Sequence, residues 1–300
     1  MFALGWIGDF VLTLSVIRRL IQEFGTEECV LVVSGPVVSL ATREFPGVRC
    51  LTLPPDAASL VRDILPVWWR ERGKFARDHF DHLVCLSHQR SLYYEVALSW
   101  IDAKHDVRLL PATYPTFADD DWCTELLAHH RVVESALGRT IRREDILPSF
   151  TSVPTGDDGR LLVYPLSRDL TRSMIPSPLI ETLVQWRQHS AAPVVFAGSP
   201  ADASMLGHYA TAARAAGLSR VSVETPDGLD ALLGQIAGAG ALFCGDSAPA
   251  HIAAALDKHS TAMTSEAFYG YCQPWSRSER QKVFRLGTRP DLVAASLPGL

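Results

Sequence analysis

Apolar residues along the chain fall into short runs that alternate with stretches of helical spacing. The segments Leu161–Tyr164, Val194–Ala197 and Val221–Glu224 are short, rich in apolar residues and followed by polar turns, as strands of a buried sheet are. Between them, apolar positions recur every three or four residues, as in amphipathic helices. This alternation predicts parallel sheets whose strands are joined by right-handed helical crossovers.

The N-terminal half shows the same alternation. A very short apolar segment opens the chain, a glycine-containing turn follows, and helical spacing then runs from Phe10 to Phe24. Further strands are predicted over Cys29–Ser34 and Asp81–Ser87. Because the first strand is so short, the sequence leaves open whether Met1 is the native start.

Periodicity is lost between Leu147 and Gly159, where Pro, Ser, Thr, Gly and Asp predominate. The strand and helix pattern resumes after this stretch. We therefore predict an α/β protein of two Rossmann-like parallel-sheet domains, residues 1–150 and residues 151–300, facing each other across a cleft.

Composition narrows the class of protein. With 300 residues and 47% hydrophobic content the chain can bury two cores, and its net charge of −5 provides no general attraction for nucleic acid. No apolar run is long enough to span a membrane and no leader opens the chain, so we expect a cytoplasmic protein. The segment Ala57–Phe80 mixes aromatic and basic residues, which allows at most peripheral membrane contact, with a solvated helix as the alternative.

The cysteines and the acidic run give no metal-site pattern. The six cysteines lack paired metal spacing, so we expect buried free thiols in a reducing compartment. His129 and His130 have no suitably spaced partners, and Asp119-Asp120-Asp121 suits a solvated loop and helix start better than a metal site.

The most distinctive stretch is Ala241–Leu256. Four apolar residues predict a buried strand, Gly245 permits a tight turn, and Asp246 or Ser247 can cap the Ala-rich helix that follows. A helix N-terminus beyond a strand carries unpaired N–H groups that attract phosphate, and His251 is near enough to donate to the same anion. A capped turn without a ligand is the alternative.

Polar residues follow other predicted strands, at the edge of a parallel sheet where ligands bind. Asp9 follows the Gly8 turn at a helix N-terminus, where a purely structural helix cap is one interpretation. His88 and Arg90 follow the strand Asp81–Ser87, as candidate acceptor contacts or ordinary surface-loop residues.

Together these segments resemble the heptosyltransferase-like glycosyltransferases of family 9, which have the GT-B fold. The family's N-terminal pattern is similar to Gly5–Asp9 with Thr13, and its donor motif is similar to Asp246–Ala255. Its mid-domain strand with an Arg-Ser pair looks like Asp81–Ser87 with Arg90 and Ser91. Its phosphate loop resembles Ser167-Arg168-Asp169 with Arg172. The chain departs from the family pattern at Ala248, usually Gly, at Arg172, usually Lys, and in the segment after the donor helix.

The resemblance implies an inverting, metal-independent transfer of a heptose or related sugar from an ADP-sugar to an acceptor hydroxyl. The acceptor is a glycan or a small molecule, in lipopolysaccharide core or natural-product glycosylation. No cofactor is expected, since the ADP-sugar is a co-substrate, and the oligomeric state is left open. Residues 1–150 would bind the acceptor and residues 151–300 the donor, with Asp9 as the general base.

The implied binding residues form two sets. Those expected to bind the donor, and to stabilise the departing diphosphate, are Ser167, Arg168, Arg172, Asp202, Asp227, Asp246, Ser247, Ala248, Pro249, Ala250 and His251. Those expected to bind the acceptor are Gly8, Thr13, His88 and Arg90. For Asp202, helix capping is an equal alternative to binding the donor ribose.

Two other functions remain compatible with the sequence. The first is a transferase of the same fold that uses another nucleotide sugar. The second is a catalytically silent homologue that binds a nucleotide and supports a partner protein, an interpretation favoured by Ala248 and the altered segment after the donor helix.

Overall fold

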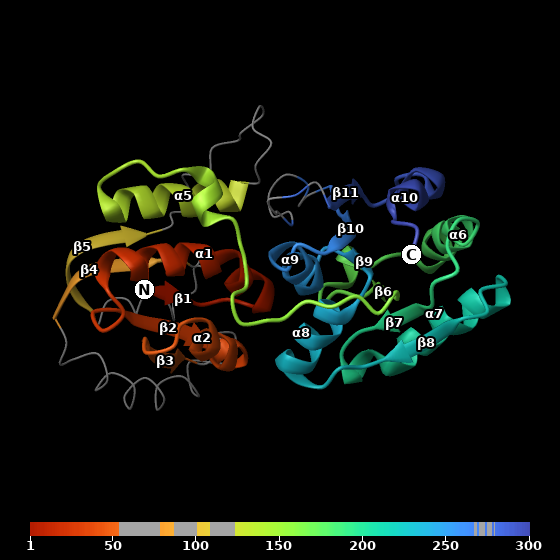
Figure 1. The fold of residues 1–300 in the computed structure, drawn as a ribbon, viewed down its shortest axis with the longest axis horizontal. Helices are drawn as coiled ribbons and strands as arrows, with labels where there is room; N and C mark the ends of the chain where they lie inside the picture. Colours follow the sequence, from red (N-terminus) through yellow and green to blue (C-terminus); the bar gives the residue numbers. More distant parts are fainter. Residues whose placement is uncertain are drawn as a thin grey trace. The chain divides into compact units, whose positions relative to one another are not determined.

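The computed structural model describes residues 1–53, 79–86, 101–108, 124–266, 269, 274, 278 and 280–300. These residues divide into two compact units on either side of the junction between Ile146 and Leu147 (Figure 1). Each unit carries helices and a parallel sheet, as the alternating pattern predicted. Of the aromatic and basic segment Ala57–Phe80, residues 57–78 lie outside the described residues. Its last two residues, His79 and Phe80, begin a strand, so the predicted helix does not extend to Phe80.

The first unit is built on a parallel sheet of strand order β3-β2-β1-β4-β5. Its elements are β1 (Phe2–Ala3), α1 (Ile7–Phe24), β2 (Val30–Ser34), η1 (Gly35–Val37), α2 (Val38–Glu44), β3 (Arg49–Leu53), β4 (His79–Cys85), β5 (Asp102–Arg108), α5 (Thr124–Leu137) and η3 (Arg143–Ile146). The short β1 lies at the centre, where Phe2 is in register with Val32 on one side and Cys85 on the other. The turn after β1 therefore lies at the middle of the sheet's carboxyl edge.

Helix α1 begins at Ile7, earlier than the predicted Phe10. Gly8 and Asp9 already have helical conformation, so Asp9 is the third helical residue, and the N-cap position belongs to Trp6. The interpretation of Asp9 as the N-cap residue is therefore wrong in position, although Asp9 does lie in the first helical turn.

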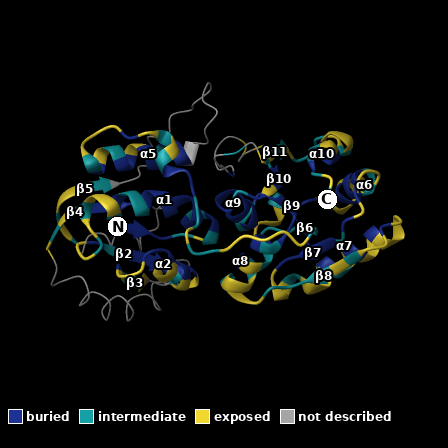
Figure 2. Cartoon of the chain, viewed as in Figure 1, coloured by how far each residue is buried: buried dark blue, intermediate teal, exposed yellow. Residues whose placement is uncertain are grey.

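The second unit is built on a parallel sheet of order β11-β10-β9-β6-β7-β8. Its elements are β6 (Leu161–Tyr164), η4 (Leu170–Arg172), α6 (Pro176–Trp186), β7 (Val194–Ala197), η5 (Pro200–Asp202), α7 (Ala203–Ala215), β8 (Val221–Glu224), α8 (Gly228–Gly238), β9 (Ala241–Gly245), α9 (Ala248–Ala255), β10 (His259–Thr264), β11 (Gln281–Arg285) and α10 (Pro290–Ser296). Figure 2 shows its central strands as buried.

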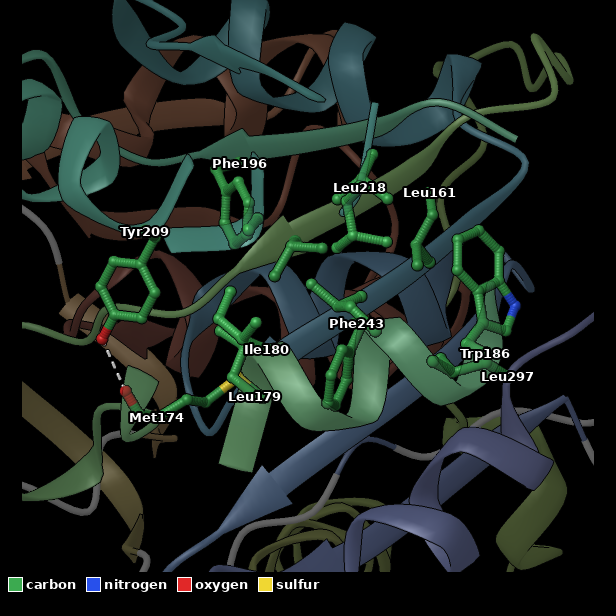
Figure 3. Close-up of a cluster of buried hydrophobic side chains, with 14 of the residues drawn as sticks. Leu161, Met174, Leu179, Ile180, Trp186, Phe196, Tyr209, Leu218, Phe243 and Leu297 are labelled. Carbon is green, nitrogen blue, oxygen red and sulfur yellow. Dashed lines mark hydrogen bonds between the residues drawn. The ribbon is translucent and has the colours of Figure 1, made fainter. Parts of the chain in front are cut away.

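The main core of the second unit lies between the sheet and helices α6, α7 and α10. Leu161 and Phe243 from the strands pack there with the fully buried Trp186 (Figure 3). The indole N–H of Trp186 donates to Pro298 O at 2.9 Å. Tyr209 joins the cluster and its hydroxyl donates to Met174 O at 2.6 Å. Each large side chain buried in this way stabilises the fold by roughly 1.5–3 kcal/mol.

The predicted linker is hydrogen-bonded to the second unit. Gly156 N donates to Ala237 O at 2.8 Å, and Asp158 N donates to Gly238 O at 2.9 Å. Residue Lys258 is only 9% exposed, and its ammonium donates to Gly156 O at 2.5 Å. These contacts fix the path by which the chain enters β6.

Candidate active site

Asp9 lies in the first turn of α1, directly after the connection from β1. Its carboxylate Oδ2 accepts the backbone N–H of Trp6 at 2.8 Å, so it pairs one of the N–H groups left open at the helix N-terminus. A Cβ atom on Gly5 would lie 2.7 Å from the same Oδ2 and 2.8 Å from the Asp9 Cβ. Glycine is therefore required at residue 5 for the Asp9 side chain to occupy this position.

Of the predicted acceptor-binding residues, the structure describes Gly8 and Thr13. Gly8 is buried. Thr13 is 3% exposed and its hydroxyl donates to Phe10 O at 2.7 Å, one turn earlier in α1. Acceptor binding by these two residues stays a prediction, and His88 and Arg90 lie outside the described residues.

The turn between β9 and α9 in the second unit follows the predicted form. Ser247 occupies the N-cap position, and Pro249 lies in the first helical turn, where its missing N–H costs nothing. The Ser247 hydroxyl makes no capping bond; it donates instead to Gly245 O at 3.4 Å. His251 is 4% exposed and lies at the fourth helical position.

Arg172 connects this turn to the loop after β6. Its Nη2 donates to the backbone oxygen of Asp246 at 2.7 Å and lies 3.0 Å from the Asp246 carboxylate. The Asp246 side chain is 2% exposed and also accepts from the Thr264 hydroxyl at 3.3 Å. A Cβ on Gly245 would lie 3.1 Å from Arg172 O, so glycine allows the two loops to approach closely. Asp246 thus holds a cation at the carboxyl edge of the sheet.

The loop after β6 is stabilised by its own hydrogen bonds. The Asp169 carboxylate caps η4 by accepting Thr171 N at 3.0 Å and the Thr171 hydroxyl at 2.7 Å, which lowers the pKa of Asp169. Ser167 N donates to the Ser173 hydroxyl at 3.0 Å. Arg168 is exposed on this loop. The loop therefore presents Arg168 and Arg172 from a fixed backbone.

Asp202 has the same arrangement as Asp9. Its Oδ2 accepts Ser199 N at 3.0 Å and the Ser199 hydroxyl at 2.6 Å, which caps η5. At the N-cap position of α7 the Asp202 side chain makes no capping bond, so the capping interpretation holds for η5 and not for α7. Asp227 is exposed at the N-cap position of α8 and its side chain makes no capping bond. Binding of the donor by either carboxylate stays a prediction.

Sequence reasoning did not find two residues that shape these turns. Thr264, at the end of β10, contacts Asp246, and Ser34, at the end of β2, donates to Gly5 O at 2.7 Å. Both are the last residue of a strand, and this position is the signal that could have found them.

Among the described residues, no three His, Cys, Asp or Glu side chains are grouped as a metal site. His129 Nε2 lies 3.2 Å from Leu86 O and His130 Nε2 lies 2.9 Å from Ile141 O, so both imidazoles contact backbone. Cys29, Cys85 and Cys244 are buried free thiols, while Cys50 is partly exposed. No helix in the described part of the chain is long and apolar enough to cross a membrane.

A comparison with protein families matches part of the second unit. Residues 181–297 match the family model of glycosyltransferase family 9 (heptosyltransferase). The match includes Asp202, Asp227 and the turn into α9, and it excludes Asp9 and Arg172. A comparison with curated proteins found no match.

Solved structures of similar fold cover nearly the whole chain. The E. coli ADP-heptose lps heptosyltransferase II has a TM-score of 0.66 at 15% identity, over 98% of this chain and 96% of that one. The E. coli heptosyltransferase WaaC with ADP has a TM-score of 0.69 at 14% identity, over 95% and 92%. A family 9 glycosyl transferase from Veillonella parvula has a TM-score of 0.71 at 14% identity, over 95% and 84%.

The fold is therefore that of the GT-B glycosyltransferases. Together with the family match in the second unit, it identifies the chain as a glycosyltransferase similar to the family 9 heptosyltransferases.

Proposed function

We propose that this protein transfers a heptose or related sugar from an ADP-sugar to an acceptor hydroxyl, with inversion and without a metal ion. The acceptor belongs to the lipopolysaccharide core or to a natural product, and the reaction takes place in the cytoplasm. The contact between Arg172 and Asp246 carries this proposal, because it fixes a cation beside the start of α9.

In this proposal the diphosphate of the donor binds at the turn into α9. A half-buried guanidinium held by two contacts is well suited to a phosphate oxygen, and N–H groups at a helix start favour the same anion. Arg168 and His251 add positive charge or hydrogen-bond donors as the diphosphate departs. The similar E. coli heptosyltransferase WaaC was solved with ADP, which supports ADP as the nucleotide.

Asp9 acts on the acceptor. As the hydroxyl oxygen bonds to the anomeric carbon, its proton moves to the Asp9 carboxylate, and the bond to the diphosphate oxygen breaks with both electrons on ADP. A single displacement of this kind inverts the anomeric configuration. The Trp6 N–H bond to Oδ2 keeps the carboxylate oriented before substrate binds.

The proposal is tested by thermal unfolding of the full chain with ADP-, GDP-, UDP- and TDP-sugars. A ligand at about 100 times its Kd stabilises a protein by about 2.7 kcal/mol, so the true donor raises the Tm clearly. We expect the ADP-sugar to do so, and ADP release with an acceptor to persist in EDTA. Stabilisation by no sugar nucleotide, or by another base alone, would contradict the proposal.

A further inference from the structure

Trp6 is the exposed aromatic side chain nearest in sequence to Asp9. It is 38% exposed, whereas Trp186, the other tryptophan in the described part of the chain, is 0% exposed. Single apolar residues are common on protein surfaces, so exposure alone assigns no role. The position of Trp6 gives more information, because it follows the central strand of a parallel sheet at the carboxyl edge, where ligands bind.

The backbone around Trp6 is held by three hydrogen bonds. The Ser34 hydroxyl donates to Gly5 O at 2.7 Å, Trp6 N donates to Asp9 Oδ2 at 2.8 Å, and Phe10 N donates to Trp6 O at 3.0 Å. The chain thus holds a partly exposed indole on a fixed turn. Because this backbone is already ordered, binding a ligand through the indole costs only the side-chain freedom of Trp6.

We propose that Trp6 is an acceptor-binding residue whose indole stacks against the C–H face of an acceptor sugar ring. The indole offers a broad apolar face together with one N–H donor, which suits a ring that is apolar on its faces and hydroxylated at its rim. Since Asp9 accepts the backbone N–H of Trp6, the residue that carries the indole and the proposed base are joined by a hydrogen bond. A sugar stacked on Trp6 would thus be bound by a residue only three positions before Asp9 in the chain.

This inference rests on the proposed function and narrows it. It requires the acceptor to carry a sugar ring, so it excludes a small-molecule acceptor without one. Trp6 would contribute to affinity for the acceptor and not to binding of the nucleotide, which is assigned to the second unit.

The test measures equilibrium binding of a sugar probe without donor. The probe is the acyl-free core oligosaccharide released from heptose-deficient lipopolysaccharide, titrated by calorimetry into the full-length protein. We expect Trp6→Ala to weaken binding at least about tenfold and Trp6→Phe to stay within about threefold of the native protein, as for an aromatic anchor. Leu292→Ala, which truncates a 53% exposed apolar side chain on α10, serves as the control and should change nothing.

Equal binding by Trp6→Ala and the native protein would overturn the inference, and so would absence of binding by the native protein. Should Trp6→Ala fail to fold, Trp6→Leu replaces it, because leucine is apolar but lacks the flat aromatic face. Trp6-dependent binding without transfer from any nucleotide sugar rejects the proposed function alone. Transfer with Trp6-independent binding rejects this inference alone.

Discussion

Arg172 and Asp246 are joined through one nitrogen, since Arg172 Nη2 reaches both the backbone oxygen of Asp246 at 2.7 Å and its carboxylate at 3.0 Å. The residues are 74 positions apart in the chain, so folding of the second unit creates the pair. Because the Asp246 side chain is 2% exposed and the Arg172 side chain 23% exposed, the carboxylate is the buried anchor and the guanidinium the accessible group.

This relationship predicts how each partner affects binding of ADP. Arg172→Ala should weaken ADP binding by about 1–3 kcal/mol, the loss of a charge-assisted hydrogen bond. Asp246→Asn should weaken it about tenfold by loosening Arg172, and the double variant should be no worse than Arg172→Ala alone. Calorimetry with ADP measures all three. Asp291→Asn removes the carboxylate of the exposed Arg289–Asp291 pair and should leave ADP affinity unchanged.

ADP affinities that fall additively in the double variant would show that the two residues act independently. An unchanged ADP affinity in Arg172→Ala would show that the diphosphate does not bind at Arg172.

Gly5→Ala should reduce activity more than stability. The added Cβ would lie 2.7 Å from Asp9 Oδ2, so the carboxylate must move away from its bond with Trp6 N. A displacement of about 1 Å at a catalytic group costs about 100-fold in rate. Gly207→Ala is the matched control, because a Cβ there meets nothing within 4 Å and glycine inside a helix costs about 0.5–1 kcal/mol relative to alanine.

The comparison uses turnover and the free energy of unfolding together. Gly207→Ala should be slightly more stable with native turnover. A Gly5→Ala variant with native turnover would show that Asp9 need not occupy its observed position.

Ser260 on β10 is a site where a substitution should stabilise the protein. Its hydroxyl is buried and has no hydrogen-bond partner among the described residues, and the residue is 3% exposed. Ser260→Ala should therefore raise the free energy of unfolding by about 1 kcal/mol. The neighbouring Thr261 hydroxyl lies 3.2 Å from the Ser296 hydroxyl, so Thr261→Val should lower it by about 1 kcal/mol. Urea unfolding measures the free energy of unfolding of both variants. A loss of stability in Ser260→Ala would indicate that the Ser260 hydroxyl has a hydrogen-bond partner.

Lys258 predicts a pH dependence of stability. Burial lowers the pKa of its ammonium below the ordinary value of 10.5, against the opposing effect of Asp157 and Asp158. Between the lowered pKa and 10.5 the unfolded chain binds more protons than the folded protein, so the stability contribution of Lys258 rises with pH. Lys258→Met should therefore cost more in urea unfolding near pH 10.5 than at neutral pH. A cost independent of pH would contradict the shift.

Much of the second unit was predictable because its strands are apolar. The predicted segments Leu161–Tyr164, Val194–Ala197 and Val221–Glu224 coincide with the observed strands β6, β7 and β8. Strand β5, Asp102–Arg108, was not predicted, because this edge strand is mostly polar. Its support includes side-chain pairs such as Lys104 with Asp81 at 2.5 Å, which apolar periodicity cannot show.

The sequence predicted which residues belong to the candidate site. It did not predict which of them contact each other. Sequence motifs selected Arg172 and Asp246 separately, but their pairing depends on the register of β6 beside β9. Likewise, the start of α1 was set too late because the glycine turn was taken to extend through Gly8. The bond from Trp6 N to Asp9 follows only from the observed helix start.

The central claim is that Asp9 is the general base, and Asp9→Asn tests it most directly. An asparagine oxygen can still accept the Trp6 N–H, so folding and ADP binding should be preserved while turnover falls by roughly 100- to 10,000-fold. The matched control is Glu134→Gln. The native Glu134 carboxylate likewise accepts a backbone N–H, that of Ile141 at 3.1 Å, and this variant should keep native turnover. Turnover is measured as ADP release from an ADP-sugar in the presence of acceptor. The predicted result is a fall in turnover for Asp9→Asn and not for Glu134→Gln. Native turnover in Asp9→Asn would contradict the claim.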